Sequence, residues 1–356
     1  MDHATRFLSD LGIDHPIIQA PMAGVSTPAL AAAVSNAGGL GSLGIGASTA
    51  DQARRMIRET RALTCRPFGV NVFAQQPPRR DDGREAQWLR YIGRFFEECG
   101  APIPGSLDEI YRSFLEADDV YDMLLEERPA VVSFHFGIPS PEKIRAMREA
   151  GIRTAATATN PEEAAAIEQA GIEIIVAQGI EAGGHRGMFD PAAADERLSL
   201  SVLVRLLARQ TRLPIVAAGG IMDGQGVKAA LALGASAAQL GTAFIPCPES
   251  SASAGHRRNL VNGRGARTRL TAVPSGRPAR AIVNRYIEYG ESRDAPPVPD
   301  YPVAYDATKR LNAAAAGKGI DDFAVQWAGQ GAPLAREMPA AQLVERLVAE
   351  WRQASG

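Results

Sequence analysis

The sequence predicts an α/β fold, a (β/α)8 TIM barrel, and three observations lead to this class. Eight short apolar runs recur along the 356 residues, and eight parallel strands close such a barrel. Several runs are apolar without alternation, as expected for strands that are buried on both faces. Each run is followed by a segment with helix-start and helix-end signals, so strands and helices alternate along the chain.

The expected strands follow one another at spacings that leave room for a helix between most of them. They are His15–Ala20, Leu40–Leu43, Phe68–Phe73, Ala130–Phe136, Ile152–Ala156, Ile172–Ala177, Pro214–Ala218 and Ala237–Leu240. Asn160-Pro161 is typical of a helix start, with a capping side chain before a proline in the first turn. Ala150-Gly151 is typical of a helix end, where glycine takes the left-handed conformation.

Two segments interrupt this alternation. Residues 75–129 are too long for a simple crossover, and we interpret them as an elaborated third crossover with helical segments at Glu85–Cys99 and Leu107–Glu127. Residues 246–309 are polar and rich in Arg, Ser and Pro, and we expect a small substrate or lid domain there.

The remaining residues complete the predicted domain organisation. The barrel is expected to comprise residues 1–245 and 310–335. A separate C-terminal helix is expected at 336–356, because apolar residues recur there at helical spacing.

Composition narrows the possible partners and location. The formal net charge of −2 provides no overall attraction for nucleic acid or an acidic membrane. The three cysteines lie far apart, which predicts neither a disulfide framework nor a zinc site and suits the cytoplasm. No stretch approaches the ~18 apolar residues of a membrane span, and the first 14 residues lack the apolar centre of a signal peptide. The histidines show no ligand spacing, so no metal is expected.

Catalytic residues of a TIM barrel lie at the carboxyl ends of its strands, so the residues that follow each run are the candidates. The densest signal is QGIEAGGHRG at 178–187. Its glycines allow the main chain to approach a ligand closely and present His185 beside it. The turn Ala20-Pro21-Met22 is either a simple entry to the first helix or a wall for a flat ligand.

Two polar side chains lie at the ends of other expected strands. Asn71 is flanked by valines and needs hydrogen bonds, either in a core network or to a ligand. His135 is either a structural histidine or a functional one.

The last two strands end in segments that are typical of a phosphate site. Gly219-Gly220 follows the seventh strand, and Gln239-Leu240-Gly241-Thr242 spans the end of the eighth. Backbone N–H groups at this corner of a TIM barrel often bind phosphate. Ordinary turn formation is the alternative explanation.

Tyr301, Tyr305 and Lys309 follow the expected lid at i, i+4 and i+8. On a helix that begins near Asp300, they would share one face and could hold a small anion. The alternative is a solvated helix face. Trp327 marks a later turn, where it could pack on a cofactor or close the barrel.

Taken together, QAPMAG, GVNVF, SFHFG, the loop at 178–187, PIVAAGGI, AAQLGTAF and WAGQG resemble the nitronate monooxygenase family, formerly called 2-nitropropane dioxygenases. The resemblance runs from about Pro16 to Gly331 and is to the bacterial class I type, an FMN-dependent TIM barrel.

The resemblance implies that FMN is bound without a covalent link. It implies cofactor contacts at Ala20, Pro21, Met22, Asn71, Gln178, Gly183, Gly184, Gly219, Gly220, Gln239, Leu240, Gly241 and Thr242. It identifies His185 as the active-site histidine. His135, Tyr301, Tyr305 and Lys309 would surround the substrate, with Lys309 suited to a carboxylate such as that of propionate 3-nitronate.

The implied activity is the oxidation of alkyl nitronates by O₂ through a flavin semiquinone, a detoxifying reaction that yields an aldehyde-type product and nitrite. His185 would either hydrogen-bond the nitro oxygens or accept the α-proton of a neutral nitroalkane. An FMN-dependent NAD(P)H:quinone or enoyl-thioester reductase on the same barrel is the alternative function. A flavin-binding protein without catalysis and a barrel for another phosphorylated ligand are further alternatives. The expected partners are the nitronate and O₂, and the expected assembly is a monomer or homodimer.

Overall fold

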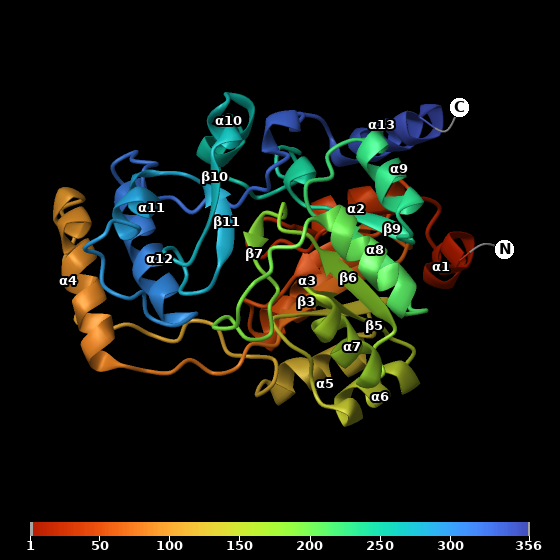
Figure 1. The fold of residues 1–356 in the computed structure, drawn as a ribbon, viewed down its shortest axis with the longest axis horizontal. Helices are drawn as coiled ribbons and strands as arrows, with labels where there is room; N and C mark the ends of the chain where they lie inside the picture. Colours follow the sequence, from red (N-terminus) through yellow and green to blue (C-terminus); the bar gives the residue numbers. More distant parts are fainter. Residues whose placement is uncertain (1–2, 355–356) are drawn as a thin grey trace.

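A computed structural model describes residues 3–354 and has eight parallel strands in one sheet (Figure 1). The strands are β1 (Ile17–Gln19), β2 (Gly41–Gly44), β3 (Phe68–Phe73), β4 (Val131–His135), β5 (Arg153–Ala158), β6 (Ile174–Gln178), β8 (Ile215–Ala218) and β9 (Ala237–Leu240). The sheet order runs from β1 through β9, β8, β6, β5, β4 and β3 to β2. A bridge between Ile18 and Leu40 brings β1 to β2 and nearly closes the barrel. The predicted fold class and all eight predicted strands are therefore confirmed.

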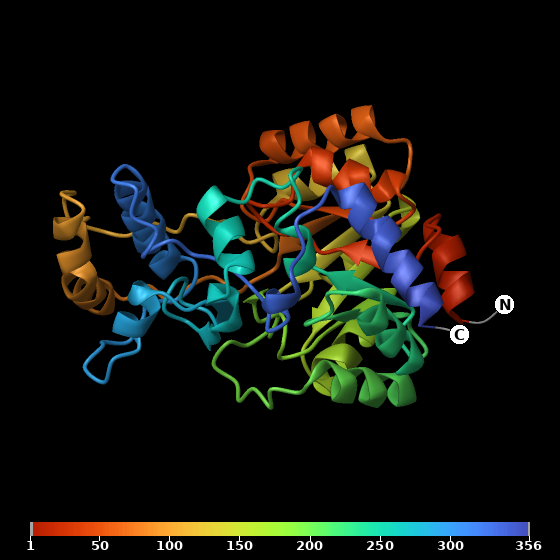
Figure 2. The same cartoon turned by 90° about the horizontal axis from the view of Figure 1, so that it is seen from above.

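A ring of helices covers the outside of the barrel. Seven of them directly follow strands or their loops: α2 (Pro28–Asn36), α3 (Ala50–Leu63), α5 (Asp118–Glu127), α6 (Pro141–Glu149), α7 (Pro161–Gln169), α8 (Leu200–Gln210) and α9 (Gly224–Ala232). The eighth position is occupied by α13 (Ala340–Gln353), which packs between α9 and α2 (Figure 2). Its buried residues Leu343, Val344 and Leu347 join the main core. The C-terminal helix is thus part of the barrel wall.

The amino-terminal end of the barrel is covered by α1 (His3–Leu11). Phe7 and Leu11 of this helix pack with Ile18, Ile174 and Val216 in one apolar cluster. Since this end is filled by apolar side chains, the opposite end is where a ligand can enter.

A second helical unit stands beside the barrel (Figures 1 and 2). It joins α4 (Asp82–Glu98) from the third crossover to α11 (Arg285–Gly290) and α12 (Val303–Ala316) from the far part of the chain. Their shared apolar cluster includes Trp88 and Tyr286. The crossover therefore does not simply lie over the barrel, because the apolar face of α4 is buried against α12.

Two details differ from the sequence-based expectations. The predicted helical segment Leu107–Glu127 is helical only from Asp118, because residues 107–117 run as irregular chain between α4 and α5. The expected boundary after Lys309 lies inside α12. The other domain limits remain predictions, and their outermost residues, 1–2 and 355–356, lie outside the described part of the chain.

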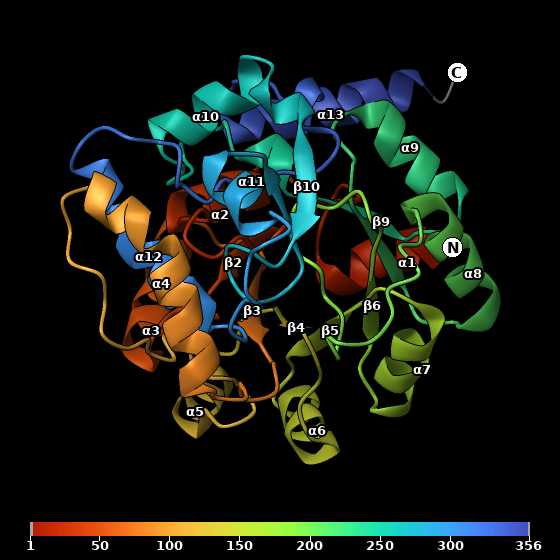
Figure 3. The same ribbon diagram turned by 60° about the vertical axis from the view of Figure 1, so that its left-hand side comes forward.

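A small antiparallel sheet connects the barrel to the second unit. Its strands are β10 (Thr268–Thr271), β11 (Ala279–Ile282) and the two-residue β7 (Gly184–His185), in the order β10-β11-β7. The neighbouring helix α10 (Ala254–Val261) and the short 3-10 helices η1 (Thr242–Phe244), η2 (Arg264–Ala266) and η3 (Ala332–Leu334) complete this region. Figure 3 shows this region and the second unit in front of the barrel strands. In residues 3–354, no helix is long and apolar enough to cross a bilayer.

Candidate active site

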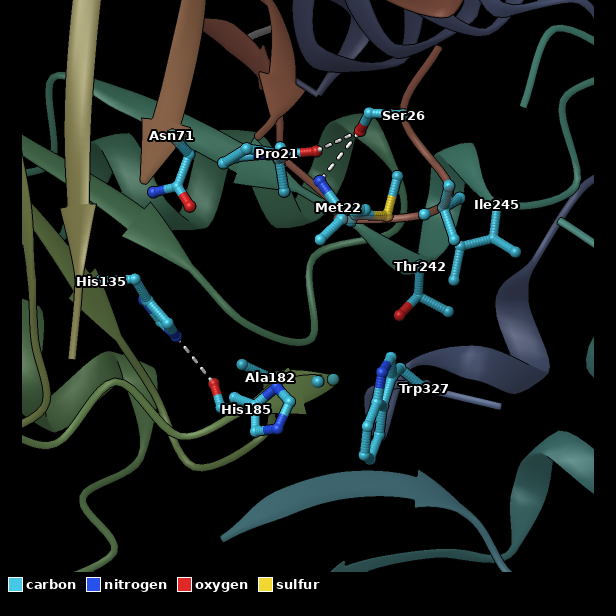
Figure 4. A pocket seen from close by; sticks show the side chains of 18 of the residues that line it. Pro21, Met22, Ser26, Asn71, His135, Ala182, His185, Thr242, Ile245 and Trp327 are labelled. Carbon is cyan, nitrogen blue, oxygen red and sulfur yellow. Dashed lines mark hydrogen bonds between the residues drawn. The ribbon is translucent and has the colours of Figure 1, made fainter. Parts of the chain in front are cut away.

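A cavity of about 710 Å³ lies at the carboxyl ends of the barrel strands. It is lined by strand ends on one side and by Tyr301, Tyr305, Lys309 and Trp327 on the other. Figure 4 shows His135, His185, Asn71 and Thr242 around this space. The structure brings all of the sequence-predicted site residues to the cavity wall except Leu240. Their roles toward a ligand remain predictions.

Leu240 is the exception because side chains alternate across a strand. Gln239 points into the barrel and lines the cavity. Leu240 points outward and is buried in the core between sheet and helices. Its carbonyl accepts a hydrogen bond from the N–H of Ala20, so its contribution is to the closure between β9 and β1.

The glycine loop is held by the side chain that precedes it. Nε2 of Gln178 donates to the carbonyl of His185 at 2.9 Å, and Oε1 of Gln178 accepts from the N–H of Gly187 at 2.8 Å. His185 also pairs with Ala279 in the antiparallel ladder of β7 and β11. Gln178 therefore shapes the loop with both polar atoms of its amide. Its contact with a cofactor remains a prediction.

His135 joins strand β4 to the same loop. Its Nε2 lies 3.2 Å from the carbonyl of His185, and its Nδ1 lies 3.0 Å from Oγ1 of Thr157. A carbonyl only accepts, so Nε2 of His135 carries the hydrogen and Nδ1 accepts from the threonine hydroxyl. Burial lowers the pKa of His135 to about 4, and the ring is neutral at pH 7.

His185 lies among aromatic rings. The ring centroids of Trp327, Tyr301 and Phe136 lie 4.9, 5.2 and 5.5 Å from that of His185. Burial, with smaller contributions from His135 and Arg277, lowers the pKa of His185 to about 3. The imidazole is therefore neutral, and it lies edge-on to Phe136 and Tyr301 and tilted against Trp327 at the cavity wall.

The corner at the ends of β8 and β9 is formed by backbone. The N–H groups of Gly219, Gly220 and Gly241 have no hydrogen-bond acceptor within the described chain. Gly219 and Gly220 have φ angles of 129° and 70°, a conformation that favours glycine. Oγ1 of Thr242 accepts from the N–H of Gly329 at 3.0 Å, which leaves its hydroxyl hydrogen for a ligand. Several free donors at one corner fit a phosphate group.

The first strand ends in a turn fixed by a buried amide. Gln19 is fully buried, and its Nε2 donates to Oγ of Ser26 at 2.9 Å. The same Oγ accepts from the N–H of Met22 at 2.9 Å (Figure 4).

Asn71 combines both roles that the sequence left open for it. Its Nδ2 donates to Oγ of Ser133 at 2.9 Å, so Asn71 belongs to a core network and also lines the cavity.

The stripe of Tyr301, Tyr305 and Lys309 differs from the prediction in one respect. Helix α12 begins at Val303, so Tyr301 precedes the helix instead of occupying its first turn. All three residues still line the cavity. Nζ of Lys309 donates to Oη of Tyr111 at 2.5 Å. Burial lowers the pKa of Lys309 and raises that of Tyr111 to about 12, so the tyrosine keeps its hydrogen at neutral pH.

The charge of the cavity favours anions. Among the described residues that line it, Lys309 is the one Lys or Arg, and no Asp or Glu is present. A further cation, Arg277, lies behind the wall with its guanidinium 4.3 Å from the centroid of Phe136. Phe136 has a left-handed φ of 75°, which is rare for a bulky residue and places its ring between Arg277 and His185.

Several residues near the site were missed by the sequence analysis, among them Tyr111, Ser275 and Arg277. Each comes from an irregular segment whose neighbours are about 90 to 200 positions away. No local pattern marks them. In residues 3–354, no group of three or more His, Cys, Asp or Glu is placed to hold a metal ion.

The family model and the curated relatives agree on one family. The family model described as nitronate monooxygenase matches residues 5–350. A nitronate monooxygenase of Pseudomonas aeruginosa is 58% identical over 98% of this chain and 99% of its own. Among solved structures, a nitroalkane oxidase from Streptomyces ansochromogenes superposes with a TM-score of 0.90 at 43% identity, covering 98% of each chain. FabK from Thermotoga maritima has a TM-score of 0.75 at 30% identity, covering 98% of this chain and 96% of its own.

The two neutral histidines predict a loss of stability in acid. An unfolded histidine binds a proton below its pKa of 6.5, whereas folded His135 stays neutral until about 4. The stabilisation is therefore complete above pH 6.5 and is lost as the pH falls toward 4. When the pH falls from 7 to 5, the unfolding free energy of both proteins should decrease. The decrease should be about 2 kcal/mol smaller for His135→Gln than for the wild type, because the variant lacks this histidine. Urea denaturation of both proteins at each pH measures this, and equal losses would contradict the pKa assignment.

Proposed function

The chain belongs to the nitronate monooxygenase family, and on that premise we propose that FMN is its cofactor and a carboxylated nitronate its substrate. The enzyme is an oxidoreductase that oxidises alkyl nitronates. The observation that carries the proposal is a single cavity with free N–H donors at one corner, a lysine in its wall and no carboxylate among its described lining residues.

The residues present fit the phosphate of FMN. The backbone N–H groups of Gly219, Gly220 and Gly241, with the hydroxyl of Thr242, would hold it. At Gly183, a Cβ atom would lie 2.4 Å from the nitrogen of Gly329, so the glycine loop must be free of side chains to meet the WAGQG segment. Bound FMN would supply the redox chemistry toward the nitronate and O₂.

The chain's own residues would bind and orient the nitronate. His185 would face its nitro group. His135 would hold the glycine loop in place through its hydrogen bond to the His185 carbonyl. Tyr301, Tyr305 and Trp327 would exclude water from one face. Lys309 would pair with a carboxylate on the substrate, which favours propionate 3-nitronate over an alkyl nitronate that has no carboxylate.

The proposal extends to location and partners. The three cysteines are free, which suits a reducing cytoplasm. The partners would be the nitronate and O₂, with no nucleic acid, membrane or metal, and the chain would act as a monomer or homodimer that detoxifies nitronates.

The visible spectrum of the purified enzyme tests the cofactor and the substrate together. The protein should be yellow, and anaerobic addition of propionate 3-nitronate should change the flavin spectrum while NADH and NADPH leave it unchanged. Reduction by NAD(P)H without a response to the nitronate would favour the quinone or enoyl-thioester reductase, the activity class suggested by the likeness to FabK. A colourless protein would contradict the FMN proposal.

We predict that His185→Asn keeps FMN but loses most nitronate turnover, by about 100-fold or more in kcat. The reason is that His185 lies at the substrate side of the cavity, whereas the phosphate corner is made by other residues. Flavin content and steady-state oxygen uptake measure the two properties. Unchanged turnover would contradict the role of His185.

We also predict that Lys309→Met raises KM for propionate 3-nitronate by about tenfold or more. An alkyl nitronate without a carboxylate should show a much smaller change, since it makes no ion pair with the lysine. Oxygen uptake with both substrates provides the comparison. Equal changes in KM would remove the carboxylate-binding role of Lys309.

A further inference from the structure

Ser275 lies behind His185, outside the cavity. It is fully buried, and its Oγ lies 2.9 Å from Nε2 of His185. It is not among the residues that line the cavity, so it touches no ligand. Its hydroxyl hydrogen has two possible acceptors, Nε2 of His185 and the carbonyl of Arg277 at 3.1 Å.

The carbonyl of Arg277 decides between them. Ser275 is its one hydrogen-bond donor in the described chain, and a buried carbonyl without a donor costs free energy. An imidazole, in contrast, can supply a hydrogen of its own from either nitrogen. When Ser275 donates to Arg277, its Oγ accepts an N–H from His185. Only this arrangement satisfies all three groups.

The turn that carries Ser275 has little freedom to rearrange. The N–H groups of Ser275 and Gly276 both donate to the carbonyl of Ala272, at 3.1 and 2.7 Å. Gly276 has a φ of 88°, and a Cβ atom there would lie 2.2 Å from the carbonyl oxygen of Pro299. The backbone that carries Ser275 is therefore held at one position relative to β11 and His185.

The other nitrogen of His185 faces the opposite way. Nδ1 makes no hydrogen bond within residues 3–354 and is not sealed from solvent, and the residue lines the cavity. We propose that Ser275 is a positioning residue that holds neutral His185 in the Nε2–H tautomer and so presents the bare lone pair of Nδ1 to the bound substrate.

This inference deepens the proposed function. The tautomer of His185 follows from the structure alone, whereas its effect on the reaction rests on the proposed function. Two roles were open for His185, donation of a hydrogen bond to the nitro oxygens and acceptance of a proton. A neutral ring with its hydrogen turned toward Ser275 has only an acceptor left for the ligand. His185 can therefore accept the α-proton of a neutral nitroalkane at Nδ1, which leaves the nitronate anion, and Ser275 keeps that nitrogen free of hydrogen.

The tautomer can be measured directly by ¹⁵N NMR of the enzyme labelled at histidine, with His185 assigned from the spectrum of His185→Gln. The wild type should show His185 with hydrogen on Nε2, and Ser275→Ala should show a mixture of both tautomers. Hydrogen on Nδ1 in the wild type would overturn the proposal, as would an unchanged single tautomer in Ser275→Ala. The wild-type spectrum decides the tautomer even if that variant does not fold.

Turnover of 3-nitropropionate, whose nitro group is neutral and whose α-proton must be removed, provides a second readout, with propionate 3-nitronate as the substrate that needs no proton transfer. Ser275→Ala should lower kcat/KM for 3-nitropropionate by about tenfold or more, the scale seen when a residue that fixes a histidine tautomer is removed. Ser275→Thr, which keeps the hydroxyl, should restore both the tautomer and most of the turnover. A Thr variant with the Ala variant's tautomer mixture would overturn the proposal.

Ser35→Ala is the matched control. Ser35 is equally buried, and its Oγ donates to the carbonyl of Pro67 and accepts from the N–H of Gly41, far from His185. It should leave tautomer and turnover unchanged, and an equal loss of turnover there would overturn the specific role of Ser275. A wild type with the expected tautomer but no nitronate turnover would refute the proposed function alone.

Discussion

The architecture of the site depends on one backbone carbonyl, that of His185. It accepts hydrogen bonds from Gln178 at the end of β6 and from His135 at the end of β4, while its residue pairs with Ala279 of β11. Two barrel strands therefore meet at this oxygen, and the small sheet joins them at the same residue. Because the glycine loop has few side chains of its own to pack, this convergence is what holds the imidazole at the cavity wall.

The electrostatics of the cavity follow from what surrounds that imidazole. Arg277 stands behind Phe136, and Lys309 stands beside Tyr111. Arg277 disfavours a proton on His135 and His185, and both cations attract a negatively charged ligand. The positive charge lies at the edges of the cavity and not on the imidazole of His185. The neutral histidine is thus compatible with an anionic substrate in a wall that has no carboxylate among its described residues.

The sequence was sufficient for the barrel and for one wall of the site. Parallel strands buried on both faces leave continuous apolar runs, and the residues near or beyond their carboxyl ends, such as Asn71, His135 and His185, meet at one end of the barrel. The opposite wall could not be derived in the same way. Ser275 and Tyr111 reach the site through irregular chain, and the pairing of β7 with β11 joins segments nearly 100 positions apart. The absence of Leu240 from the cavity wall has a simpler cause, since consecutive residues of one strand face opposite sides.

The position of α13 has a consequence for how the molecule is made. The helix that belongs after β9 is postponed by about 100 residues, so its neighbours α2 and α9 share an uncovered apolar groove until the very end of the chain arrives. Synthesis proceeds from the amino terminus, so every other helix of the barrel wall is made before α13. Until residues 340–353 have been synthesised, the apolar surface of α2 and α9 that α13 covers in the folded protein has no partner helix.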